Sequence, residues 1–124
     1  MKKGYSFLLF LLFTVTCTLS TVYASSLYDI NQKVCTRFEE DVSRLAAIME
    51  ELRRRKGIQE TRVAFGNVDT QIESADYWIT YAAEAIAYQR AKDFSSAGTL
   101  RSNLENLKGK VLKAKGEVKK ALNE

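Results

Sequence analysis

The chain has 124 residues, enough for one domain, with 46% hydrophobic residues, 27% charged residues and a formal net charge of +4 at neutral pH. It contains no Pro, no His and only 6 Gly, a composition that favours helices and disfavours the tight turns of β-hairpins. The absence of His removes the commonest metal ligand and the side chain that titrates nearest neutral pH. We therefore expect no metal, no cofactor and no catalytic group of the usual acid–base type.

The first 24 residues have the organisation of a secretory signal. Lys2 and Lys3 give a short positive start, residues 7–13 are wholly apolar, and Val22-Tyr23-Ala24 offers compact residues before a cleavage point. We predict a signal peptide over residues 1–24, cleaved after Ala24, and a mature domain over residues 25–124. The predicted location is extracytoplasmic, either periplasmic or secreted.

Two alternatives remain for this segment. Residues 5–24 form an apolar stretch of 20 residues, which is just long enough to span a bilayer as an uncleaved anchor with the C-terminal domain outside. In addition, Lys3-Gly4-Tyr5-Ser6-Phe7 resembles a type IV prepilin leader, which implies cleavage after Gly4. The sequence departs from that family at Leu9, where a pilin normally has Glu, and it has no strand-forming C-terminal half.

Cleavage after Ala24 changes both the charge and the thiols. It removes Lys2, Lys3 and no acidic residue, so the net charge falls from +4 to +2, which removes the composition-level case for nucleic acid as a partner. It also removes Cys17 and leaves Cys35 as the only thiol. We expect Cys35 to be either a buried small hydrophobe or an intermolecular disulfide.

A first helix is predicted over about residues 27–56. Its apolar seam repeats every 3.5 residues, the period of a coiled-coil helix, with Ile30, Val34 and Ile48 widening the stripe. At its end, residues 53–56 place cations on the last carbonyls and Gly57 suits a left-handed ending. The seam consists of Asn31, Cys35, Phe38, Val42, Leu45, Met49 and Leu52.

A second helix is predicted over about residues 60–91. We prefer this early start because the seam keeps its phase through Phe65 and Val68. The alternative is a start at Asp69, where Thr70 and Glu73 form a capping box. The seam consists of Ile58, Thr61, Phe65, Val68, Ile72, Ala75, Ile79, Ala82, Ile86 and Gln89.

A third helix is predicted over about residues 95–122. Asp93, Ser95 and Ser96 are all good N-caps for it. Gly109 and Gly116 lie off its seam, in an outward column of small residues. The seam consists of Ala97, Leu100, Leu104, Leu107, Val111, Ala114, Val118 and Ala121.

Three helices joined by short turns must run up, down and up. The sequence therefore predicts an all-α fold, an antiparallel three-helix bundle with coiled-coil-like heptad packing, preceded by the N-terminal signal or hydrophobic helix. A strict seven-residue repeat implies a left-handed supercoil. The product is similar in architecture to a spectrin repeat, a likeness of shape without that family's sequence markers.

Two surfaces are candidate partner-binding sites. Tyr77, Tyr81 and Tyr88 fall on the face of the second helix opposite the seam, where each supplies a large rigid area with a polar tip. The second surface is a basic tip, where the ends of the first and third helices meet. We define the basic tip as Arg53, Arg54, Arg55 and Lys56 together with Arg62, Lys115, Lys119 and Lys120. Cations at the C-terminal ends of helices are also favoured by the helix dipole, so they do not by themselves indicate a binding site. Both surfaces therefore stay candidates for partner binding.

These observations favour a non-enzymatic binding, adaptor or spacer module in the cell envelope or outside the cell. A protein, an anionic envelope polymer or a lipid surface is the expected partner, with membrane contact only through residues 1–24 if they are retained. The alternative is a membrane-anchored stalk or pilin-like structural subunit that keeps its N-terminal hydrophobic helix.

Overall fold

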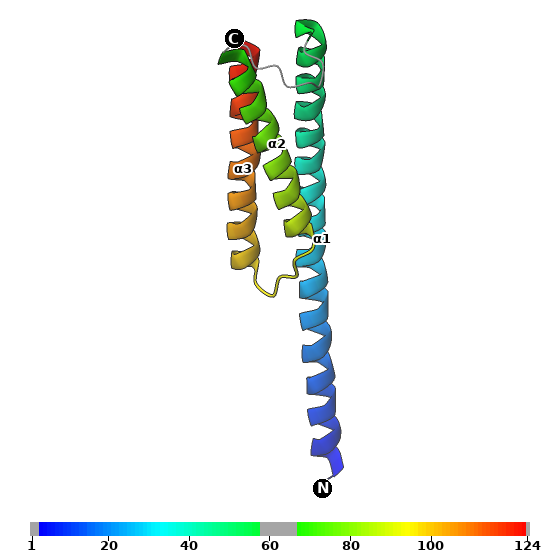
Figure 1. The fold of residues 1–124 in the computed structure, drawn as a ribbon. Coiled ribbons are helices and arrows are strands. Elements are labelled where there is room, and N and C mark those ends of the chain that lie inside the picture. Colours follow the sequence, from blue (N-terminus) through cyan, green and yellow to red (C-terminus); the bar gives the residue numbers. More distant parts are fainter. Residues whose placement is uncertain (1–2, 58–66, 124) are drawn as a thin grey trace.

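The structure, a computed structural model, describes the backbone of residues 3–57 and 67–123 and the side chains of residues 26–57 and 70–123. Over these residues the chain forms three helices, α1 (Lys3–Lys56), α2 (Asn67–Arg90) and α3 (Ala97–Asn123), and no strand. Each helix contacts both of the others, and successive helices run in opposite directions (Figure 1). The predicted all-α fold of three packed helices is confirmed.

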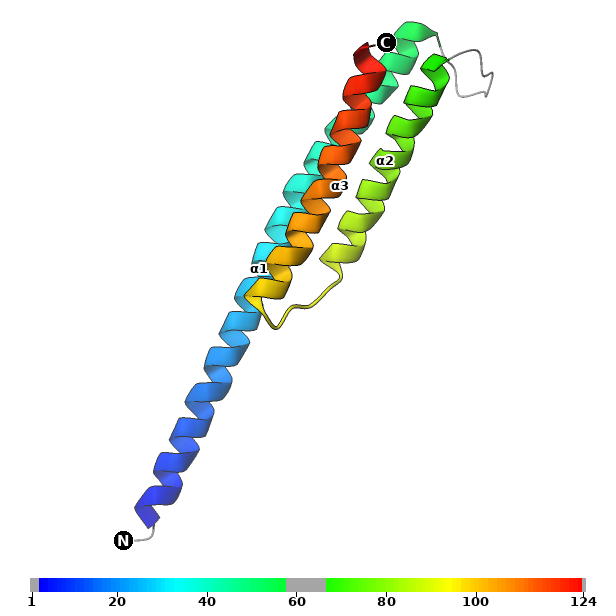
Figure 2. The same cartoon turned by 90° about the vertical axis from the view of Figure 1, so that its left-hand side faces the viewer.

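The helix α1 is longer than predicted. The sequence predicts a separate helix from about residue 27, whereas α1 runs without a break from Lys3 to Lys56. Its N-terminal part extends beyond the ends of α2 and α3 (Figures 1 and 2). The physical reason is that no Pro occurs in the chain and no Gly lies between Gly4 and Gly57, so nothing interrupts the backbone hydrogen bonds at Ala24.

The ends of the helices follow the predicted signals. Gly57 has a φ of 66°, and its amide donates to the carbonyl of Arg54 over 3.3 Å, which is one of the two bonds of a Schellman ending. At the start of α3, the carbonyl of Ser96 accepts the first helical bond, from Leu100, so Ser96 occupies the N-cap position. These two residues set where α1 ends and α3 begins.

The start of α2 is only partly tested. The structure describes α2 from Asn67, two residues before the alternative start at Asp69. The preferred start near residue 60, and the seam positions Ile58, Thr61 and Phe65, lie outside the described residues.

The main core lies between the three helices and is built from the predicted seams. Every buried residue in it occupies a seam position, and Phe38, Trp78 and Ala85 pack against it while partly exposed. A smaller cluster of Leu27, Phe94 and Leu100 closes the end near the α2–α3 turn. The main core contains Cys35, Val42, Leu45, Met49 and Leu52 from α1, Ile72, Ala75, Ile79, Ala82 and Ile86 from α2, and Leu107, Val111, Ala114, Val118 and Ala121 from α3.

The predicted widening of the α1 stripe is wrong at two positions. Ile30 is 45% exposed and Ile48 is 41% exposed. Each lies beside the seam, and α1 has only two neighbours, so part of its circumference faces solvent. Ala97, predicted on the seam of α3, is also exposed because it is the first residue of that helix.

A pair of buried amide side chains joins α1 to the end of α2. Asn31 is fully buried and Gln89 is 4% exposed. The Nε2 of Gln89 donates to the Oδ1 of Asn31 over 2.9 Å, and the Nδ2 of Asn31 donates to the carbonyl of Gln89 over 3.0 Å. Beside this pair, Gln32 donates to the carbonyl of Arg90 over 2.9 Å. The carbonyls of Gln89 and Arg90, in the last turn of α2, thus each accept a hydrogen bond from a side chain of α1.

In the part of the chain whose side chains the structure describes, no helical stretch is long and apolar enough to cross a membrane. Residues 1–24, where the anchor alternative lies, are outside that part.

Substitution of Leu45, Ile79 or Leu107 by Ala is expected to lower the free energy of unfolding by about 2–5 kcal/mol each, because each truncation leaves a cavity in the core. Leu112→Ala is the matched control, since Leu112 is 54% exposed and its truncation should cost less than about 0.5 kcal/mol. Urea titration measures all four. Losses as small as the control at all three core positions would contradict the packing described here.

Candidate functional site

Exposed aromatic rings cluster on α2. The rings of Tyr77 and Tyr81 are nearly parallel, with an interplanar angle of 6° and centroids 6.1 Å apart. Trp78 meets both edge-on, at 5.6 Å from Tyr77 and 5.5 Å from Tyr81, a favoured geometry for aromatic pairs. Tyr77 is 62% exposed and Tyr88, further along the same side of α2, is 70% exposed.

Three lysines place their ammonium groups over these rings. The Nζ of Lys113 lies 5.4 Å from the ring centroid of Trp78, that of Lys110 lies 5.0 Å from Tyr81, and that of Lys92 lies 4.4 Å from Tyr88. These are cation–π distances, and they hold the ammonium groups at the ring surfaces. We call this surface the aromatic–lysine face, which consists of Tyr77, Trp78, Tyr81, Tyr88, Lys92, Lys110 and Lys113.

A buried carboxylate supports one end of this face. Glu117 is 5% exposed, and its Oε1 lies 2.9 Å from the Nζ of both Lys120 and Lys113. Ser74 of α2 donates to its Oε2 over 3.1 Å. The hydrogen bonds from Lys120 and Lys113 lower the pKa of Glu117 to about 2, against the opposing effect of burial. Because Lys113 also lies over Trp78, Glu117 links the core to the exposed rings.

The structure brings the arginines of the basic tip together with acids. Arg53 forms an ion pair with Asp76 of α2, while Arg54 and Arg55 both bind Glu51, each at 2.7 Å. Hydrogen bonds from Arg54 and Arg55 lower the pKa of Glu51 to about 2. Each of the three predicted arginines thus has an acidic partner, and one net positive charge remains because Arg54 and Arg55 share Glu51.

The rest of the basic tip is more open where it is described. Lys56, Lys115 and Lys119 are exposed and form no ion pair with another described residue, whereas Lys120 binds Glu117. Arg62 lies outside the described residues. Less free positive charge is left at the tip than the sequence suggested.

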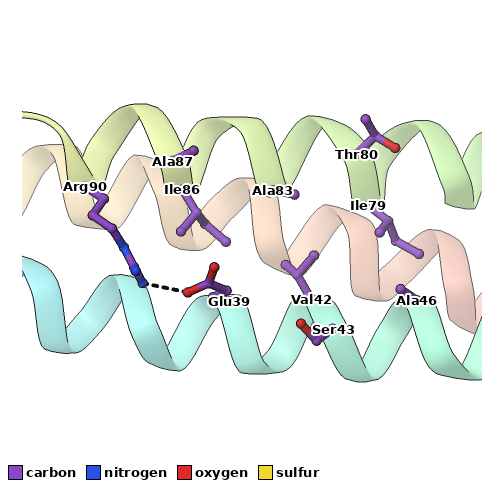
Figure 3. A pocket seen from close by; sticks show the side chains of 10 residues that line it. All are labelled: Glu39, Val42, Ser43, Ala46, Ile79, Thr80, Ala83, Ile86, Ala87 and Arg90. Carbon is purple, nitrogen blue, oxygen red and sulfur yellow. Dashed lines mark hydrogen bonds and ion pairs between the residues drawn. The ribbon is translucent and has the colours of Figure 1, made fainter.

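Two open grooves flank α1. The groove between α1 and α2 has a volume of about 440 Å³ (Figure 3), and the groove between α1 and α3 has a volume of about 460 Å³. In Figure 3, an ion pair between Arg90 and Glu39 closes one end of the first groove, with an N–O distance of 2.6 Å. Its polar side chains otherwise are Ser43 and Thr80, on an apolar floor.

The charged residues that line these grooves are largely paired with one another. Glu39 is paired with Arg90 in the groove between α1 and α2, and Arg101 is paired with Glu105 in the groove between α1 and α3. Among the residues whose side chains are described, no group of three or more acidic or thiol ligands is placed to hold a metal ion.

Cys35 lies in the core between α1 and α2. Its side chain is fully buried, and its Sγ lies 3.7 Å from the Oδ1 of Asn31. Burial raises the pKa of the thiol, an effect that Arg90 partly offsets. A protonated thiol without solvent access reacts slowly, so the structure favours the small-hydrophobe interpretation over an intermolecular disulfide.

The sequence pointed to the three tyrosines but not to their neighbours. Trp78 is the only Trp in the chain, and its place among three tyrosines was a usable signal. A weaker sequence signal existed for Glu117. Lys113 lies four residues before it and Lys120 three residues after it, which places both lysines beside it on one side of a helix. No sequence signal connected Lys110 and Lys113 to α2, because that contact depends on how α3 packs.

No protein-family model matches the chain, and no significant match was found among the curated proteins or among the solved structures.

Glu117→Gln is expected to lower the free energy of unfolding near neutral pH, and the difference from the wild type should shrink in acid. The folded-state pKa of about 2 lies below the ordinary 4.5. The stabilisation is therefore complete above about pH 4.5 and is lost as the pH falls towards 2. Urea titrations of the wild type and the variant across this pH range measure the difference between their free energies of unfolding. Glu51, whose pKa is also lowered, contributes equally to both proteins and does not affect this difference. A difference that stays constant with pH would contradict the ionised state of Glu117.

Proposed function

We propose that this protein is a small exported, non-enzymatic helical-bundle protein that acts by binding, as an adaptor or spacer in the cell envelope or outside the cell. Its partner docks on the aromatic–lysine face and carries negative charge. The signal peptide over residues 1–24, the extracytoplasmic location and the coiled-coil-like heptad packing belong to this proposal. The observation that carries it is the set of three lysines held over the rings of two exposed tyrosines and the partly exposed Trp78 of α2.

The chemistry of the face supports binding in two ways. Tyr and Trp bring large, rigid contact areas at a low cost in conformational entropy, which is why they dominate the energetics of interfaces. The lysines add positive charge, and two of them, Lys92 and Lys110, form no ion pair with another described residue. Their charge is thus available to an anionic partner.

The basic tip is the weaker candidate. A partner that used Arg53, Arg54 or Arg55 would first have to displace Asp76 or Glu51. Removal of one partner from a charge pair costs energy that the new contact must recover. We therefore assign to these arginines mainly a structural role. Arg53 stabilises the contact between α1 and α2, and Arg54 and Arg55 stabilise the last turn of α1.

A second candidate function is a membrane-anchored stalk. It is favoured by the continuity of α1, which passes through Ala24 and Ser25 as one helix. The intact mass of the purified mature protein separates the two. A first residue of Ser25 is expected for the exported module, Met1 would indicate the stalk, and Tyr5 would indicate a pilin-like subunit.

We expect the double variant Tyr77→Ala and Tyr88→Ala to bind anionic ligands at least about tenfold more weakly than the wild type, a loss of about 1.4 kcal/mol. The ligand panel consists of phosphatidylglycerol vesicles, polygalacturonate and polyglutamate, and the fluorescence of Trp78 reports binding. Tyr28→Ala is the matched control, since Tyr28 is an exposed tyrosine of α1. Its affinity should stay within about twofold of the wild type.

The variant with Arg53, Arg54 and Arg55 all changed to Gln tests the competing surface. It should bind like the wild type at equal ionic strength while it unfolds more easily, because it loses its ion pairs and its favourable charges at the end of α1. If this variant loses binding and the tyrosine variant does not, the partner docks on the tip. If no ligand of the panel changes the fluorescence of Trp78, the proposed function is wrong.

A further inference from the structure

The two grooves beside α1 carry opposite charges along their edges. At the groove between α1 and α2, Glu50 lies one helical turn from the lining residue Ala46, and Glu84 lies one turn from the lining residue Ala87. Both acids are exposed, and neither forms an ion pair with another described residue. The ion pair that closes one end of this groove adds no net charge (Figure 3). We call this groove, with Glu50 and Glu84 at its edges, the acidic groove.

The groove between α1 and α3 has cations in the corresponding places. Lys108 lines it from α3, and Arg37 lies one helical turn from Val34, which lines it from α1. Both cations are exposed and form no ion pair with another described residue. Two further charged residues of this groove, Arg101 and Glu105, bind each other over 3.0 Å. We call this groove, with Arg37 and Lys108 at its edges, the basic groove.

The side chains of the two grooves are also complementary in size. Small residues form much of the acidic groove, with Ser43 and Ala46 from α1 and Ala83 and Ala87 from α2 (Figure 3). The basic groove has a larger apolar side chain on its α1 side, because Ile30 lines it while 45% exposed. Helices pack when a ridge of side chains on one enters a groove on the other. The ridge at Ile30 therefore suits the small residues of the acidic groove.

We propose that the basic groove of one copy of this chain docks on the acidic groove of a second copy. The exposed Ile30 of one copy is buried against Ala83 and Ala87 of the other, and the cations at the edges of one groove meet the acids at the edges of the other. The contact is heterologous, so each copy binds one neighbour through each groove, and the copies form an open chain or a ring. Neither groove includes a residue of the aromatic–lysine face, so this assembly does not depend on the proposed function.

A second copy fits better than other occupants. The same chain supplies both surfaces, whereas a symmetric contact of either groove with itself would place like charges against each other. A small apolar ligand is disfavoured because ligand pockets enclose most of the ligand, while both grooves are open along α1. A contact about 20 Å wide and about 16 Å long buries roughly 650 Å² over both copies, an area typical of weak, reversible association.

Sedimentation velocity on protein purified from expression of the full chain tests the contact between about 10 μM and about 1 mM. The average mass should rise with concentration, and about 0.5 M salt should reduce the rise by screening the charges. Ala83→Arg blocks the acidic groove and Ile30→Glu blocks the basic groove, and each should lower the association constant at least about tenfold. Removal of charge alone, by Arg37→Gln with Lys108→Gln, should lower it at least about threefold.

Matched controls carry the same changes outside the two grooves. Ala91→Arg alters an exposed alanine of α2, and Ile48→Glu alters an isoleucine of α1 that is 41% exposed. Neither residue lines a groove, so each control should associate within about twofold of the wild type. Unchanged melting temperatures check the fold of every variant.

A mixture of the two blocked variants tests the direction of the contact. Ala83→Arg keeps the basic groove and Ile30→Glu keeps the acidic groove, so one working contact remains for each pair of copies. The mixture should form 1:1 dimers and nothing larger, although each variant alone stays monomeric.

Three results would overturn the inference. The first is a mass that stays at that of one chain up to about 1 mM. The second is an equal loss in the groove variants and their controls, which would mean that overall charge governs association. The third is a mixture of the blocked variants that stays monomeric. Since none of these variants alters the aromatic–lysine face, the proposed function would stand in each case.

Discussion

The buried contact between Asn31 and Gln89 determines how α1 lies along α2. Apolar seams that repeat every seven residues still match after a shift of one repeat, so they do not select a single register. A buried amide finds its partner in only one register and is costly to leave unpaired elsewhere. The ion pairs Arg90–Glu39 and Arg53–Asp76, at either end of the α1–α2 joint, form in that same register. The aromatic–lysine face belongs to α2 and α3, and these contacts hold α1 against α2.

The two basic surfaces differ in what holds their cations. At the tip, Arg54 and Arg55 converge on the carboxylate of Glu51, which cancels one of their two positive charges within one turn of helix. On the face, Lys92 and Lys110 rest on tyrosine rings, which attract an ammonium group without cancelling its net charge. A charge count along the sequence ranks the tip first, whereas the contacts favour the face as the site for an anionic partner.

Much of the fold was predictable from the sequence, because the seams have one unbroken period and Gly57 and Ser96 mark helix ends with their usual chemistry. The core residues of all three helices followed from that period. The cleavage expected after Ala24 stays a prediction, since recognition by a peptidase does not require a bend in the backbone, and α1 passes through this point as one helix. The exposure of the three tyrosines followed from their angle on α2. The contacts of Lys110 and Lys113 of α3 with Tyr81 and Trp78, and the burial of Glu117, depend on how α3 packs against α2, which no local sequence pattern predicts.

A double-mutant cycle on Asn31 and Gln89 tests most directly whether this polar contact sets the register of the bundle. Each residue is changed to Ala, singly and together, and the free energy of unfolding is measured by urea titration. Each single variant leaves a buried amide without its partner, so the two losses should overlap in the double variant, with a coupling of about 1 kcal/mol or more. A coupling below about 0.3 kcal/mol would mean that the two amides act independently, and the register would then have to come from the apolar seams.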